Sequence, residues 1–221
     1  YVLRAAASTG FRAPSLHQLY FSATSSLFQE GVISNSGTFT NDSRVAKLLG
    51  IPQLNEEKSK SVSAGVTANW GKFKLSVDGY FIRIDDRIVY TGAFTGSNAA
   101  GASDQDKEIY QLLQQANATS ARLFANAIDT ETRGLDVVLT YQDRFGRGKL
   151  RGDLSATFSK TNVVGDVHAS DLLKGKESTY FDRSSRIYLE SPVPRTKVNL
   201  SLNYSLDKWN VYLRNVYFGE V

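Results

Sequence analysis

The stretch from Ser61 to Phe81 constrains the fold of this chain more than any other segment. On each side of Gly71, apolar side chains alternate with small or polar ones, in SVSAGVTANW and then in KFKLSVDGYF. Because successive side chains of a β-strand point to opposite faces, this pattern predicts an antiparallel hairpin with one apolar and one polar face. The fold class then depends on whether the apolar face meets a protein core or lipid.

Similar alternation recurs along the chain and predicts about seven strands. We expect them at residues 1–8, 61–70, 72–90, 133–142, 149–158, 198–206 and 209–217. The connections alternate between long segments, at 9–56, 91–121 and 163–193, and tight turns, at 71, 143–148 and 207–208. A meander with every long loop at one end and every short turn at the other is typical of a transmembrane β-barrel.

Two helical segments are expected inside the long connections. A short helix is predicted near 44–49, where Gly50 and Pro52 would stop it. A second is predicted over Asp104–Asn117, since Ile109, Leu112 and Leu113 fall on one stripe of a helix there.

A soluble β-sandwich also alternates apolar and polar residues, so the positions of the aromatic residues matter more. Rings lie at the ends of the apolar face, where a sandwich core has no reason to place them. This predicted lipid-facing girdle consists of Trp70, Phe73, Phe81, Tyr141, Phe158, Trp209 and Tyr217. Phe73 and Phe81 are eight residues apart. In a tilted strand this separation corresponds to a rise of about 19–20 Å along the barrel axis, which approaches the height of the apolar band of a membrane barrel. The predicted fold class is therefore all-β: a partial transmembrane antiparallel meander β-barrel with long extracellular loops, one of them carrying a short helix.

Composition excludes several other classes. The chain has no Cys and no apolar run long enough for a spanning helix, and its net charge of +4 comes from scattered basic residues. We therefore expect no disulfide framework and no nucleic-acid partner. The chain contains no Met and begins at Tyr1 within a strand pattern, so we interpret it as a piece of a longer polypeptide.

No catalytic constellation is visible, so we expect neither enzymatic activity nor a cofactor nor a metal site. Asp85 and Asp86 are adjacent and would face opposite ways, which favours a salt-linked strand end over paired catalytic acids. Candidate side chains for ligand contact lie in the long loops, where loop-to-loop packing is the alternative role. These candidates are His17, Tyr20, Phe21, His168, Tyr180 and Phe181.

Basic residues gather near the short turns. They either attract an anionic substrate or anchor the strand ends at a wet rim. They are Lys72, Lys74, Arg144, Arg147, Lys149 and Arg151.

Five motifs, in order, resemble a known family. They are FRAPSL at 11–16, Leu54 with Glu57, Ser59 and Gly65, YFIRIDDRIV at 80–89, Asn126 with TRGLD at 132–136, and VPRTKVNL at 193–200. Together they resemble the barrel of TonB-dependent outer-membrane transporters. Within the second motif, Glu56 stands where the family has proline and Ser63 where it has a second acid.

The resemblance implies a function and a set of partners. It implies part of a 22-stranded barrel in the outer membrane of a Gram-negative bacterium, which binds a ferric siderophore or another large nutrient and imports it. It implies contact with outer-membrane lipid, with a small-molecule or glycan ligand outside, with the receptor's own plug domain, and with TonB of the inner-membrane energising complex. On this interpretation residues 1–221 are a fragment of the barrel domain, and the plug and the closing strands lie outside it. A passive porin and a soluble β-sandwich adhesin or ligand-binding module remain alternatives.

Overall fold

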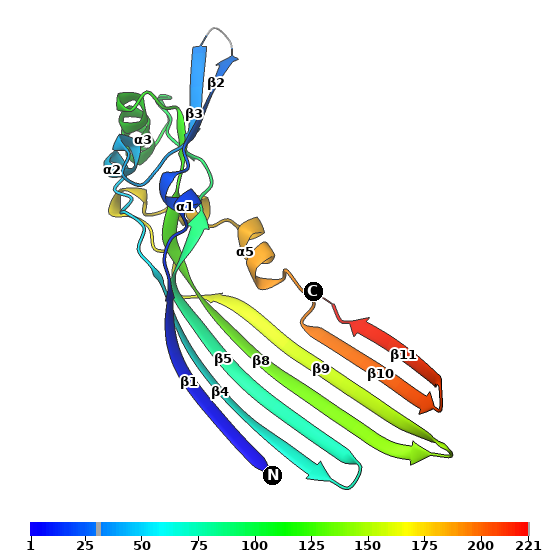
Figure 1. Cartoon of the computed structure of the whole chain (residues 1–221). Coiled ribbons are helices and arrows are strands. Elements are labelled where there is room, and N and C mark those ends of the chain that lie inside the picture. The colour runs from blue at the N-terminus through cyan, green and yellow to red at the C-terminus, as the bar shows by residue number, and fades with distance from the viewer. Residues whose placement is uncertain (30–31, 221) are drawn as a thin grey trace.

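A broad, curved antiparallel sheet forms the body of the molecule (Figure 1). This computed structural model describes residues 1–29 and 32–220, and within them the sheet has seven strands. Its strands are β1 (Val2–Arg12), β4 (Glu57–Trp70), β5 (Phe73–Tyr90), β8 (Phe124–Phe145), β9 (Gly148–Val164), β10 (Thr196–Leu206) and β11 (Trp209–Phe218). They lie in the sheet in the order in which they occur in the chain. This is one meandering sheet and not two packed sheets, so the β-sandwich alternative is wrong.

Tight turns join the strands at one end of the sheet. Each turn begins with a residue whose φ is positive: Gly71 at 55°, Gly146 at 60° and Asp207 at 49°. Positive φ is what two-residue hairpin turns require, and glycine and aspartate tolerate it better than most residues. The predicted positions of all three short turns are confirmed.

The register places like side chains side by side across the sheet. Val137 of β8 lies opposite Val77 of β5 and Ala156 of β9. Val77 in turn lies opposite Val66, and Ala156 lies opposite Val198. One apolar row therefore crosses five strands, halfway between the rows that contain Phe73 and Phe81.

The long connections gather at the other end of the sheet, where they fold into a separate layer (Figure 1). The first contains α1 (Leu16–Tyr20), β2 (Ala23–Gln29), β3 (Val32–Thr38) and α2 (Arg44–Leu48). The second contains β6 (Phe94–Thr95), α3 (Asp104–Gln115) and β7 (Ser120–Arg122), and the third contains η1 (Asp171–Leu173), α4 (Glu177–Tyr180) and α5 (Arg183–Glu190). A small sheet in the order β2-β3-β7-β6 joins the first connection to the second.

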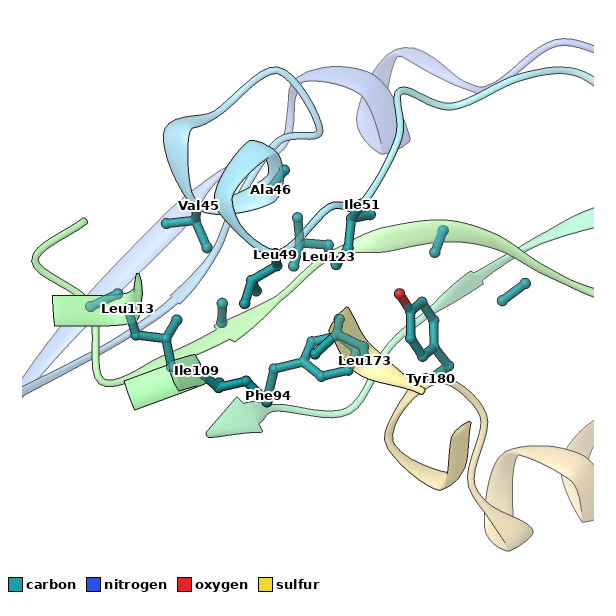
Figure 2. Close-up of a cluster of buried hydrophobic side chains, with 14 of the residues drawn as sticks. Val45, Ala46, Leu49, Ile51, Phe94, Ile109, Leu113, Leu123, Leu173 and Tyr180 are labelled. Carbon is teal, nitrogen blue, oxygen red and sulfur yellow. The ribbon is translucent and has the colours of Figure 1, made fainter. Parts of the chain in front are cut away.

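The buried apolar core lies in this layer of loops, which we call the loop cap (residues 13–56, 91–123 and 165–195). Figure 2 shows side chains from all three connections meeting there. The labelled residues are Val45, Ala46, Leu49, Ile51, Phe94, Ile109, Leu113, Leu123, Leu173 and Tyr180. The loop cap is thus held by a hydrophobic core, which also includes Ala125, Ala127 and Ile128 at the outer end of β8.

Both predicted helices are confirmed as α2 and α3, and Ile109 and Leu113 are buried as the helical stripe predicts. The structure adds helices that the sequence pattern did not predict, in the first connection (α1) and in the third (η1, α4 and α5). These extra helices are short and depend on caps: Ser15 forms a capping box with Gln18, and the Asp182 carboxylate accepts a hydrogen bond from Ser185 N. No helix in the described ranges is long and apolar enough to cross a membrane.

Strand β8 extends beyond the range that alternation predicts, as far as the edge of the loop cap, whereas β5 ends at Tyr90 as predicted. β8 begins at Phe124 rather than near residue 133, and it pairs with β5 as far as Tyr90. The alternation fails there because the register shifts between Ile84 and Arg87, where Asp86 has a φ of 58°. A bulge of this kind reverses which face each following side chain occupies.

Candidate functional site

Two candidate ligand contacts of the first connection, His17 and Phe21, form a small aromatic cluster at the loop end of β1. The rings of His17 and Phe21 stack with centroids 4.6 Å apart, and His17 meets the edge of Phe124 at 5.8 Å. Tyr20 is 73% exposed and Phe21 is 40% exposed. An exposed aromatic cluster can stack on a planar ligand, so ligand contact by these three residues stays a prediction.

The other aromatic candidates belong to the loop cap. Tyr180 is only 2% exposed; its ring meets Phe94 edge-on at 5.0 Å and its hydroxyl accepts a hydrogen bond from Ser170 N at 3.1 Å. Phe181 is partly buried against the same core. Tyr180 therefore has the loop-packing role that was the alternative for these residues.

His168 lies where the third connection passes over the ends of β5 and β8. Its backbone N donates to Ala127 O at 2.8 Å, and its ring lies between the carboxylates of Asp86 and Asp129. The sequence pattern shows no metal-ligand spacing around His168. It does not reveal this grouping because the three residues are about forty positions apart, although the Asp85-Asp86 pair marks one end of it.

Polar side chains tie the second connection to the third. Lys176 Nζ donates to Asp106 Oδ1 at 2.7 Å, and Gln105 Nε2 donates to the carbonyl oxygens of Leu172 and Lys174 at 2.7 and 2.8 Å. The pKa of Asp106 is lowered by the hydrogen bond from Lys176 and by a second one from the Ser103 hydroxyl. Both bonds favour the charged carboxylate.

Acid should therefore loosen the loop cap. A carboxyl whose pKa is depressed in the folded state contributes stability above its unfolded pKa of about 3.9, and loses it as pH falls through the folded value. Pepsin cleavage of the second connection should rise as pH is lowered from about 5 to about 2. Asp106→Asn should remove most of this pH dependence. Asp104→Asn is the matched control, because the Asp104 side chain is fully exposed on the same turn of α3. An unaltered pH dependence in Asp106→Asn would exclude this mechanism.

Two residues from the family-like motifs join strand ends to one another. Glu57 is 5% exposed; its carboxylate accepts hydrogen bonds from Arg12 Nε of β1 at 2.8 Å and from Ile88 N of β5 at 2.8 Å. Asn126 accepts from Asn55 N at 2.9 Å and donates to Asn55 O at 3.0 Å and to Asp86 O at 2.6 Å. Their role is structural: they hold the loop ends of four strands, β1, β4, β5 and β8, in register.

An ordered ion pair crosses the polar face of the sheet. Arg4 of β1 reaches over Gly65 of β4 to Asp78 of β5, donating from Nε to Asp78 Oδ1 at 2.6 Å. The guanidinium also donates to the hydroxyls of Thr67 at 2.7 Å and Ser76 at 2.6 Å. A side chain on Gly65 would occupy the same space, because its Cβ would lie 1.9 Å from Asp78 Oδ1. Glycine is required here by this close approach.

The polar face is hollowed near the short turns, and basic side chains line the hollow. Three of them are paired with carboxylates: Arg4 with Asp78, Lys72 with Asp143 and Arg151 with Asp153. The hollow has a volume of about 1000 Å³, and six of its lining residues are cationic against one acid, Asp143. The cationic lining residues are Arg4, Lys72, Lys74, Arg144, Lys149 and Arg151. Five of the six basic residues named from the sequence are thus brought together; the sixth, Arg147, pairs instead with Asp207 at 3.6 Å.

The predicted girdle residues occupy the opposite, apolar face. At the short-turn end, Trp70 stacks on Phe73 at 5.9 Å and Phe73 meets Tyr141 at 4.9 Å, which makes a row of rings across three strands. At the loop end, Phe158 is 43% exposed. On the last strand, Trp209 and Tyr217 are also exposed, at 78% and 58%.

Charges begin on this face at the row of Phe81. Phe81 lies opposite Arg133, whose guanidinium sits 5.6 Å from the Phe81 ring, and Arg133 lies opposite Lys160. The next row toward the loop cap contains Lys60 and Arg83. The uncharged band of the face therefore ends at the row of Phe81, one row beyond Phe158, as a lipid boundary lined by aromatic residues requires. A lipid-facing role for the girdle remains a prediction that this geometry supports.

Comparison with known proteins gives a family match over the whole chain. A family model described as "TonB dependent receptor-like, beta-barrel" matches residues 1–221. Among solved structures, the crystal structure of the outer membrane transporter YddB from Escherichia coli is similar, with a TM-score of 0.45 and 10% sequence identity. That match covers 76% of this chain and 20% of the transporter, so the chain spans about a fifth of that protein's length. No curated protein sequence matches the chain.

Proposed function

Because the chain belongs to the TonB-dependent receptor-like β-barrel family, we propose that it is part of the barrel wall of a transporter. This transporter binds a ferric siderophore or another large nutrient at its outer loops and imports it with energy delivered through TonB. Residues 1–221 are then a section of the barrel domain. The receptor's plug domain and the strands that close the barrel are separate from this section.

Outer-membrane localisation follows from the family and agrees with the expectation from strand alternation. In that setting the apolar face meets lipid and the polar face, with its basic hollow, lines the lumen. Lipid contact accounts for the apolar side chains left exposed on the sheet, such as Leu135, Leu154 and Leu200. The ion pair of Arg4 and Asp78 then faces the water-filled lumen, where both charges stay hydrated.

The family match across all 221 residues carries this proposal. The loop cap supports it, because a connection with its own buried core presents a rigid outer surface for recognition. The exposed side chains of His17, Tyr20 and Phe21 are the candidate contact surface at that end. The cationic lining of the hollow would favour an anionic substrate passing through the lumen.

Uptake in cells tests the proposal. A strain that lacks the receptor should fail to grow on one member of a panel of ferric siderophores and glycans as sole iron or carbon source. Growth should return with the full-length receptor and should be lost again when TonB is deleted. Growth that is restored without TonB would identify a passive porin, the remaining alternative. Restoration on no member of the panel would contradict nutrient import of either kind.

A further inference from the structure

The imidazole ring of His168 lies between the carboxylates of Asp86 and Asp129. His168 Nδ1 lies 3.6 Å from Asp86 Oδ1, and His168 Nε2 lies 3.9 Å from Asp129 Oδ1. One ligand atom from each of the three residues can be chosen so that all lie within 4.8 Å of one another. The three come from separate parts of the chain: the bulge of β5, the outer part of β8 and the third connection.

The separations are too long for hydrogen bonds, which need about 2.7–3.2 Å between the heavy atoms. The 3.6 Å between His168 Nδ1 and Asp86 Oδ1 matches the distance between two ligands of one tetrahedral zinc ion, whereas the 3.9 Å contact with Asp129 involves the other ring nitrogen. With metal–ligand bonds of about 2.0–2.2 Å, neighbouring ligands lie about 3.3–3.6 Å apart. Small side-chain movements would therefore bring one imidazole nitrogen and two carboxylates to bonding distance of a shared ion.

The surroundings fix two of the three groups. Asp129 Oδ1 accepts a hydrogen bond from Asp86 N at 2.9 Å, and Asp129 Oδ2 lies 3.4 Å from Arg83 Nη2. Outer contacts of this kind orient a carboxylate toward a metal and are common around metal ligands. The backbone hydrogen bond from His168 N to Ala127 O fixes the main chain of residue 168 beside β8, so that its imidazole starts close to both carboxylates.

The site is open to solvent but not fully exposed. The side chains of Asp86 and His168 are 44% and 42% exposed, whereas that of Asp129 is 16% exposed. A cavity of about 360 Å³, lined in part by His168 and Asn126, opens beside it. An ion can therefore reach the site from the extracellular side and keep water as a fourth ligand.

From this geometry we propose that Asp86, Asp129 and His168 form a binding site for a zinc-type divalent cation, which fastens the third connection to β5 and β8. The presence of imidazole selects zinc over calcium and magnesium, since these harder ions prefer all-oxygen sites. The proposal does not depend on the imported nutrient or on TonB. The zinc ion would lie at the rim of the barrel, apart from the path of the imported nutrient.

Zinc binding by the full-length receptor in detergent tests the proposal. After treatment with EDTA, the receptor is titrated with zinc chloride, and bound zinc is counted by mass spectrometry of the metal content. The wild type should hold one more zinc per receptor than His168→Asn does, and the affinity of this site should fall at least about tenfold in His168→Asn. Zinc should raise the Tm of the wild type but not that of His168→Asn.

Two further variants keep the result interpretable. Asp86→Asn should also lose the zinc, and it should fold, because asparagine tolerates the φ of 58° found at this position. His17→Asn is the matched control, since it removes the only other histidine and leaves the three ligands in place; it should bind zinc as the wild type does. Equal zinc content and affinity in the wild type and in His168→Asn would overturn the proposal. Displacement of the zinc by a tenfold excess of calcium would overturn the choice of metal.

Discussion

Replacing Val137 with arginine is expected to destabilise the barrel by about 2–4 kcal/mol, whereas the same change at Val138 should cost much less. Val137 lies at the middle of the apolar face, in the row with Val77 and Ala156. If this face meets lipid, the arginine is placed near the bilayer midplane, where a charge carries this cost. Denaturant unfolding of the full-length receptor, reconstituted in lipid vesicles, measures the difference.

Val138 is a close control because it is the same residue type, one position along the same strand. It is 41% exposed and lines the basic hollow on the polar face. An arginine there adds one more cation to a wet surface, with only modest repulsion. Equal destabilisation by Val137→Arg and Val138→Arg would contradict the assignment of the two faces to lipid and lumen. It would also remove the physical basis of the predicted girdle.

The sheet was predictable because its signal is local. Alternation with a period of two needs only the residues of one strand, and Gly71, Gly146 and Asp207 occur where a positive φ is needed. Helix α3 was predictable for the same reason, since Ile109 and Leu113 follow the helical period. Where the period is interrupted, as in the part of β8 that faces the bulge beside Asp86, alternation no longer marks the strand, and the start of β8 was missed.

The loop cap could not be predicted because its contacts join distant parts of the chain. Ser170 Oγ donates to Leu49 O across 121 positions, and Tyr180 packs on Phe94. No periodicity in the sequence records such contacts. One signal was available: Asp182 before the segment RSSRIYLE is a typical N-cap, which α5 uses. The grouping of His168 with two aspartates depends on the same long-range packing.

The motif residues show what a family resemblance adds. The sequence singles out Glu57 and Asn126 without saying what they do. In the fold, Glu57 joins β1 to β5 and Asn126 joins β5 to the segment before β4. A recurring motif at a strand end can thus mark register rather than ligand binding.

Replacing Gly96 with alanine should disrupt the loop cap while leaving the sheet intact. A Cβ on Gly96 would lie 2.1 Å from Tyr110 N and 2.6 Å from Asp106 O, both of them backbone atoms of α3. Backbone cannot rotate away as a side chain does, so α3 has to shift and carry Ile109 and Leu113, each 1% exposed, out of the core. Overpacking of this kind costs about 1–3 kcal/mol. Protease cleavage of the second connection in the full-length receptor should increase several-fold.

The sheet should be unaffected because its strands are paired independently of α3, and cooperative units of one protein can open separately. The folded barrel can be followed by gel electrophoresis of unheated and heated samples. The temperature at which the folded band is lost should be the same in Gly96→Ala and in the wild type. Gly101→Ala is the matched control: it lies in the same connection, and a Cβ there meets no atom within 4 Å. If Gly96→Ala resists protease as well as Gly101→Ala does, α3 is not packed as described. If Gly96→Ala also unfolds the barrel, the loop cap and the sheet are one cooperative unit, and ligand contacts at the loops would be coupled directly to the strands.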